Sequence, residues 1–134
     1  MKEFIFNEIN ESLNLKKKVL DSHEIICLVE TIVNDCIDSI NSNGKVIFCG
    51  NGGSFADSQH LAAEFISRLR IDRNPLPSLA LGTNSSNLSA IANDYGYDQV
   101  FKREIEALGK KNDILIGVST SGNSPNVIEA VKAA

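Results

Sequence analysis

Residues 44–69 read GKVIFCGNGGSFADSQHLAAEFISRL, and this stretch decides the fold. Residues 45–49 form a short apolar run with β-branched and aromatic side chains, which is typical of a buried strand. The run opens on a glycine-rich turn at residues 50–54, and a helix is predicted from that turn to about Leu69. A strand, a glycine turn and a helix in this order predict the start of a parallel βα unit.

The same alternation continues along the chain. Strands are predicted at residues 78–81 and 114–118, helices at residues 86–94 and 98–109, and a last helix from Pro125 onward. Proline is favoured in the first turn of a helix, where its missing N–H has no intrahelical partner. Strands that alternate with helices predict an α/β fold, in which a parallel sheet carries helices on both faces as a three-layer α/β/α architecture.

Two helices are predicted before the first strand, at residues 2–20 and 22–41. The second has the clearer amphipathic pattern, because its apolar side chains recur at spacings of three and four. We expect a single domain over the whole chain, made of an N-terminal helical extension at residues 1–43 and βα units at residues 44–134.

The composition argues against several classes of protein. The 134 residues carry 13 basic and 17 acidic side chains, which gives a net charge of −4. Nonspecific binding of nucleic acid requires clustered cationic side chains, so this composition argues against it. No apolar run reaches the ~18 residues of a membrane span. Glu3, Glu8 and Glu11 stand where a signal peptide would need an apolar stretch. The three cysteines fit buried, reduced thiols, so we expect a cytoplasmic protein without nucleic-acid or membrane partners.

Two loops that follow predicted strands suit an anionic ligand. Residues 50–54 read GNGGS and residues 119–124 read STSGNS. Ligands of open α/β sheets bind at the carboxyl ends of the strands, where glycines and helix N-termini present backbone N–H groups to an anion. Ordinary turn chemistry is the alternative, with Ser54 as a helix cap partnered by Asp57 and Ser124 as the cap of the last helix. Two such loops on one sheet favour a shared ligand.

Nucleotide-binding patterns fit this sequence less well. The glycine loop lacks the full G-x-G-x-x-G spacing because position 55 is Phe, and no strand ending in an acidic residue lies about 20 residues further on. The Walker pattern is absent because no lysine follows the glycines. A dinucleotide is therefore the weaker interpretation.

His60 and Glu64 stand four residues apart on the helix after the glycine loop, so they share one face. One interpretation is a solvated helix face that also carries Asp57 and Arg68. The other makes Glu64 a general base and His60 a metal ligand or orienting group, although two ligands do not define a metal site. Arg68 is expected to hold the Glu64 carboxylate ionised, which suits a metal ligand better than a base.

Asn93 and Asp94 end the predicted helix 86–94 just before Gly96. Helix termination and a contact with a ligand are both open interpretations of this pair.

Three segments taken together resemble a known family. GKVIFCGNGGSFADSQHLAAEF, AIANDYGYDQVF and VSTSGNSPNVIEAV are similar to the phosphoheptose isomerase group of the sugar isomerase (SIS) domain family. The resemblance implies a flavodoxin-like three-layer fold and a homotetramer with active sites where subunits meet. It also implies conversion of sedoheptulose 7-phosphate to D-glycero-D-manno-heptose 7-phosphate through an enediol, the first step toward the heptose of lipopolysaccharide core or capsule.

The resemblance also assigns site residues. Glu64 matches the catalytic glutamate, which is a zinc ligand in metal-bound members, and His60 matches the first histidine ligand of that zinc ion. The matches to the family's substrate contacts are Asn51, Gly52, Gly53, Ser54, Asn93, Asp94, Ser119, Thr120, Ser121 and Ser124.

The family's glutamine and second histidine have no counterpart here, since the only histidines are His23 and His60. Residues 127–134 keep helical spacing to the last position without a C-cap glycine. We expect the remaining zinc ligands and a second acid/base group beyond Ala134, and we expect the 134-residue chain alone to be inactive. The alternative function is a non-catalytic SIS module that binds a sugar phosphate or a replication initiator.

Overall fold

The computed structural model describes all 134 residues, which divide into two compact units, residues 1–35 and 36–134. The first unit contains α1 (Lys2–Asp21) and the first turns of α2 (His23–Asn41), close to the predicted helices. Ser22 separates the two helices in an extended conformation, with φ −90° and ψ 99°. Its hydroxyl accepts a long hydrogen bond of 3.4 Å from the Ile25 N–H, in the first turn of α2.

The apolar side chains of the first unit are uncovered. α1 has no buried residue, and Phe4, Ile9 and Leu13 are 61–64% exposed. None of the helices in the chain combines the length and the apolar character that a membrane crossing requires.

The second unit is built on a parallel sheet of three strands in the order β2-β1-β3. The strands are β1 (Val46–Gly50), β2 (Ser78–Ala80) and β3 (Ile114–Val118). Phe48 of β1 is opposite both Ala80 of β2 and Ile116 of β3. The predicted α/β class and parallel sheet are confirmed.

The central strand supplies both faces of the core, which explains its continuous apolar run. All five residues of β1 are buried. Val46 and Phe48 join one apolar cluster with Ala62 of α3 and Ala80. Ile47 and Cys49 join a second cluster on the other side of the sheet. Alternate side chains of a strand point to opposite faces, so a strand covered on both sides needs apolar residues throughout.

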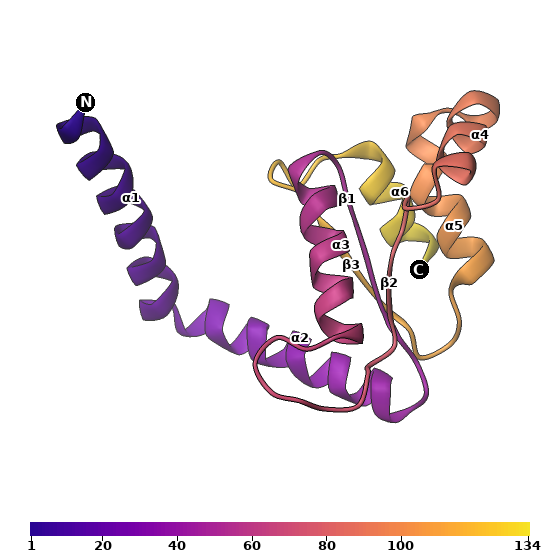
Figure 1. Ribbon diagram of the computed structural model, residues 1–134, viewed down its shortest axis with the longest axis horizontal. Coiled ribbons are helices and arrows are strands. Elements are labelled where there is room, and N and C mark those ends of the chain that lie inside the picture. Colours follow the sequence, from indigo (N-terminus) through magenta and orange to yellow (C-terminus); the bar gives the residue numbers. More distant parts are fainter. The chain divides into compact units, whose positions relative to one another are not determined.

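Helices cover both faces, as the alternation predicts. Figure 1 shows α3 (Gly53–Ile66) on one side of the sheet and α5 (Val100–Leu108) and α6 (Pro125–Ala133) on the other. The remaining elements are α4 (Ser85–Tyr95) and a short 3₁₀ helix, η1 (Tyr97–Gln99). The last turns of α2 belong to this unit as well, and Ile40 packs on the cluster around Phe48.

Helix α3 ends three residues before the predicted Leu69 because a later side chain takes over its terminal carbonyls. Both terminal nitrogens of Arg73 donate hydrogen bonds, at 2.8 Å to the carbonyl of Phe65 and at 2.9 Å to the carbonyl of Glu64. The N–H of Leu76 also donates to the Phe65 carbonyl at 3.0 Å. Carbonyls at a helix end need such partners, and local sequence pattern does not reveal them.

The alternative interpretation, in which Ser54 and Ser124 act as ordinary helix caps, is only partly right. Gly52 rather than Ser54 precedes the first turn of α3, with a φ of 55° that glycine adopts without strain, so the Ser54–Asp57 capping box is wrong. Ser124 does precede α6, but its side chain caps no helix N–H. The prediction of buried thiols holds for Cys49 and is wrong for Cys27, which is exposed.

Candidate functional site

The loop at residues 50–54, the glycine loop, and the loop at residues 119–124, the serine loop, begin side by side. Gly50, the last residue of β1, is opposite Val118, the last residue of β3. Residues 51–54 and residues 119–124 therefore leave the same carboxyl edge of the sheet, where open α/β folds bind their ligands.

The glycine loop needs glycine at two positions for different reasons. A Cβ on Gly50 would lie 2.7 Å from the backbone oxygen of Ser54, so the turn closes too tightly for any side chain. Gly52 has room around it but holds a positive φ of 55°. Gly53 and Ser54 then start α3, and the N–H groups of a first helical turn have no intrahelical partner. Such N–H groups are suited to an anion.

The serine loop is held together by its own hydroxyls. The Ser119 hydroxyl lies 3.0 Å from the Ser124 hydroxyl and 3.3 Å from the Ser121 hydroxyl. The N–H of Asn123 donates to the Ser121 hydroxyl at 3.1 Å, and Gly122 turns the chain with a φ of 66°. The hydroxyls of this loop are therefore clustered before α6 begins, which is an arrangement suited to phosphate oxygens.

A pair of carboxamides joins the two loops. Asn51 and Asn126 exchange two hydrogen bonds of 2.8 Å each, although they are 75 residues apart. The Tyr97 hydroxyl donates to the same Asn51 oxygen at 3.2 Å. Asn126 thus links the glycine loop to the helix that follows the serine loop, and Tyr97 also holds Asn51; sequence reasoning selected neither Asn126 nor Tyr97.

The predicted His60–Glu64 pair is formed on the exposed side of α3. His60 Nε2 lies 3.7 Å from Glu64 Oε1, and the two side chains are 72% and 26% exposed. The second oxygen of Glu64, Oε2, is buried without any hydrogen-bond partner. A carboxylate oxygen removed from water without a partner is costly, so this oxygen is available to a ligand or to a donor outside residues 1–134.

The expected partnership between Arg68 and Glu64 is wrong. No ion pair joins them, because α3 ends at Ile66 and Arg68 follows the helix instead of continuing its face. The cation that does reach Glu64 is Arg73, which binds the backbone carbonyl of Glu64 and not its carboxylate.

The side chains fit part of a metal site. An imidazole and a carboxylate four residues apart on a helix are able to share a divalent ion, and the orphaned Oε2 of Glu64 suits that use. The chain has no group of three or more His, Cys, Asp and Glu side chains that could hold a metal ion. His60 and Glu64 therefore fit two positions of a coordination sphere.

Asn93 and Asp94 lie in the last turns of α4, apart from the contacts described above. Asn93 donates a hydrogen bond of 2.8 Å to Asp94, and both side chains are exposed. With Ser85, Ser86 and Ser89 they line an open depression on α4. No hydrogen bond or ion pair links this pair to the glycine loop or the serine loop.

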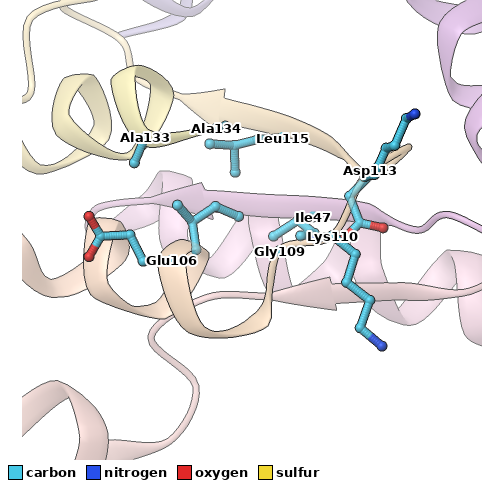
Figure 2. A pocket seen from close by; sticks show the side chains of 10 residues that line it. Ile47, Glu106, Gly109, Lys110, Asp113, Leu115, Ala133 and Ala134 are labelled. Carbon is cyan, nitrogen blue, oxygen red and sulfur yellow. The ribbon is translucent and has the colours of Figure 1, made fainter.

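A separate cavity of about 300 Å³ lies toward the amino ends of the strands (Figure 2). Ile47 and Leu115 line it together with Glu106 and with the ends of α5 and α6. Its Asp113 carboxylate is already engaged by Lys45. The cavity therefore has space but lacks the clustered hydroxyls and free backbone N–H groups of the opposite edge.

One further buried polar residue was not foreseen. Glu104 is 5% exposed and accepts a hydrogen bond of 2.5 Å from the N–H of Gly82, which fixes the turn after β2. Its position between Phe101 and Ile105 on the apolar side of α5 is the signal that could have identified it.

The sheet and its two loops define a SIS-type α/β domain, and the SIS domain family model matches residues 10–134. The chain belongs to the SIS domain family. Its relatives within that family include phosphoheptose isomerases. The one from Clostridium acetobutylicum is 49% identical over 134 residues, 100% of this chain and 68% of the relative. The one from Aneurinibacillus thermoaerophilus is 46% identical over 132 residues, 98% of this chain and 67% of the relative.

Solved structures agree with the sequence relatives. The phosphoheptose isomerase from Neisseria gonorrhoeae superimposes with a TM-score of 0.89 at 41% identity, covering 98% of this chain and 67% of that chain. The enzyme from Francisella tularensis gives 0.83 at 29% identity, covering 96% and 68%. The resemblance inferred from the motifs is confirmed, and the chain spans about two thirds of the length of these relatives.

Proposed function

We propose that the full-length protein is an aldose–ketose isomerase that converts sedoheptulose 7-phosphate to D-glycero-D-manno-heptose 7-phosphate. One observation carries the proposal: two anion-binding loops are joined at one edge of the sheet, and the helix that begins in one of them carries Glu64 near its C-terminal end, with an unpartnered carboxylate oxygen. The 49% identity to a phosphoheptose isomerase supports this choice of substrate.

The two loops are proposed to bind the sugar phosphate. Hydroxyls of the serine loop would receive the phosphate, since they donate to anionic oxygens. The glycine loop would hold the sugar chain. The proposed substrate contacts are Asn51, Gly52, Gly53, Ser54, Asn93, Asp94, Ser119, Thr120, Ser121 and Ser124.

Glu64 is proposed as the group that moves the carbon-bound proton. The reaction removes a proton from C1 of the ketose, passes through an enediol and returns a proton to C2, while a proton moves from the C1 oxygen to the C2 oxygen. A positioned carboxylate suits the carbon proton. The oxygen proton needs a second acid/base group, which we place outside residues 1–134.

Zinc is the proposed cofactor, one ion in each subunit, with His60 and Glu64 as two of its ligands. A divalent ion supplies Lewis acidity that polarises the carbonyl and lowers the barrier to enediol formation. Glu64 serves as general base or as metal ligand in this proposal. Zinc analysis of the full-length protein and its His60→Ala variant tests the assignment, because loss of one ligand should lower the bound zinc.

We also propose a cytoplasmic homotetramer whose active sites lie where subunits meet, and whose product supplies lipopolysaccharide core or capsule. The uncovered apolar side chains of α1 and α2 support self-association, because such surfaces usually meet a partner. Sedimentation of the full-length protein tests the assembly. A monomer at micromolar concentration would contradict it.

A non-catalytic module that binds a sugar phosphate or a replication initiator is the alternative. Glu64, with its buried unpartnered oxygen, favours the enzyme, because a binding module has no need of that carboxylate.

The test is to incubate the purified full-length protein with sedoheptulose 7-phosphate and to identify the product by NMR. We expect D-glycero-D-manno-heptose 7-phosphate, with fructose 6-phosphate as the control ketose phosphate. Binding of the substrate without any turnover would favour the alternative.

A further inference from the structure

Asn126 is a buried polar residue to which the proposed function assigns no part. It is 2% exposed and lies in the first turn of α6. Its Nδ2 donates to the Oδ1 of Asn51 at 2.8 Å, and its Oδ1 accepts from the Nδ2 of Asn51 at 2.8 Å. The same Oδ1 accepts the N–H of Val127 at 3.0 Å. Asn126 is therefore anchored to α6 and bound to the glycine loop at the same time.

These contacts fix Asn51 in one orientation. The Oδ1 of Asn51 receives hydrogen bonds from Asn126 and from the Tyr97 hydroxyl. A carboxamide nitrogen carries two hydrogens, and Asn126 takes one of them. The other hydrogen remains for a ligand, and its direction is set by the partners of the carboxamide.

The pair also sets the distance between the loops. Asn126 follows the serine loop by two residues, and Ser124 is bound to Ser119 across that loop. Asn51 follows Gly50 directly at the end of β1. The hydrogen bonds between Asn51 and Asn126 therefore keep the serine loop, which would bind the phosphate, at a constant distance from the glycine loop, which would bind the sugar.

We propose that Asn126 is a positioning residue: it fixes the Asn51 carboxamide and, through it, the spacing of the two loops around the sugar phosphate. The inference rests on the proposed function. A substrate held at its phosphate end must present C1 and C2 to the proton-transferring group, and an error near 1 Å in that placement costs about 10²-fold in rate.

A purely structural role predicts something different. A buried asparagine that only satisfies hydrogen bonds would lower the stability when replaced, without a specific effect on catalysis. If Asn126 acts through Asn51, its substitution should have little further effect on catalysis in a protein that already carries Asn51→Ala. The two roles are separable by a double-mutant cycle.

The experiment compares full-length wild type, Asn51→Ala, Asn126→Ala and the double variant by kcat and KM for sedoheptulose 7-phosphate. We expect each single substitution to lower kcat/KM by about 10–100-fold. The double variant should lose little more than Asn51→Ala. Losses that multiply in the double variant would overturn the proposal, and so would an Asn126→Ala enzyme with wild-type kcat/KM.

Asp113→Asn is the stability control, because Asp113 lies outside the proposed site. It should lower Tm without changing kcat/KM. If Asn126→Ala lowers Tm to the same extent and also leaves kcat/KM unchanged, its role is structural and the proposal fails.

A second readout needs no turnover. We expect Asn51→Ala to shift the backbone amide NMR signals of residues 119–124, and Asn126→Ala to shift those of residues 50–53, both in the absence of ligand. Unchanged signals would overturn the positioning role. A wild-type protein without isomerase activity would refute the proposed function alone, and the amide signals would still decide this inference.

Discussion

The two edges of the one parallel sheet differ in the polar groups that they carry. At the amino edge, the Asp113 carboxylate accepts hydrogen bonds from the Lys45 ammonium, the Lys45 N–H and the Lys110 N–H. At the carboxyl edge, glycine turns and a helix start leave N–H groups available. A polar group that is fully paired stabilises the fold, whereas an unpaired one is costly unless a ligand completes it.

The cavity and the clustered hydroxyls also lie at different edges of the sheet. The cavity of about 300 Å³ lies toward the amino edge, where the Asp113 carboxylate is paired with Lys45. The clustered hydroxyls of the serine loop lie at the carboxyl edge. Substitutions at the two edges should therefore affect different quantities: the rate at the carboxyl edge and the stability at the amino edge.

The largest effect is expected for Glu64→Gln in the full-length protein. Loss of a general base should lower kcat by about 10²–10⁴-fold. Glu106→Gln is the matched control, since it removes an exposed helical carboxylate that lines the cavity of the amino edge. Steady-state assays with sedoheptulose 7-phosphate measure both variants. A Glu64→Gln enzyme within about threefold of wild type would remove Glu64 from catalysis.

A smaller effect on activity is expected for Ser119→Ala, which deletes the hydroxyl that contacts both Ser121 and Ser124. Hydrogen bonds to a charged phosphate contribute about 1.5–3 kcal/mol, so KM should rise by about 10–100-fold while kcat changes less. Ser42→Ala, in the turn before β1, is the control for removal of an exposed hydroxyl. If Ser119→Ala and Ser42→Ala give equal KM values, the serine loop does not bind the phosphate.

At the amino edge, Asp113→Asn should change stability and leave kcat and KM unaltered. The side chain of Asp113 is 7% exposed and its Lys45 partner 21%. Loss of the charge-assisted hydrogen bonds should cost about 1–3 kcal/mol in the free energy of unfolding. Urea denaturation measures this difference. A variant as stable as wild type, or one with an altered KM, would contradict the distinction between the two edges.

The smallest expected effect is on the pH dependence of stability. Burial alone would raise the pKa of Asp113, but hydrogen bonds from the Lys45 side chain and from the backbone N–H groups of Lys110 and Lys45 outweigh it and hold the pKa below its ordinary value. The ionised carboxylate therefore stabilises the fold above the pKa of the unfolded chain, and that stability is lost as pH falls through the folded pKa. Urea denaturation of wild type and Asp113→Asn should converge as pH falls below about 4. A constant gap between them would contradict this.

Sequence reasoning succeeded where a local pattern was sufficient. β3 has the predicted bounds of 114–118, because an apolar run between turn residues identifies a buried strand. The two loops were placed at one edge because parallel strands end together. The His60–Glu64 pair followed from helical spacing alone.

It failed where distant residues decide the structure. Arg73 ends α3 before Arg68 can reach Glu64, and nothing local to α3 reveals this. Asn126 reads as an ordinary polar residue in a first helical turn until Asn51, 75 residues earlier, is placed beside it. Long-range hydrogen bonds of this kind become visible only once the fold is known.

The central claim is that the carboxyl edge holds a sugar phosphate while Glu64 moves its carbon-bound proton. The most direct test is to follow sedoheptulose 7-phosphate in D₂O by NMR with the full-length protein and with Glu64→Gln. We predict D-glycero-D-manno-heptose 7-phosphate carrying deuterium at C2 from wild type, and a conversion slower by about 10²-fold or more from the variant. Conversion at comparable rates by both proteins would contradict the account.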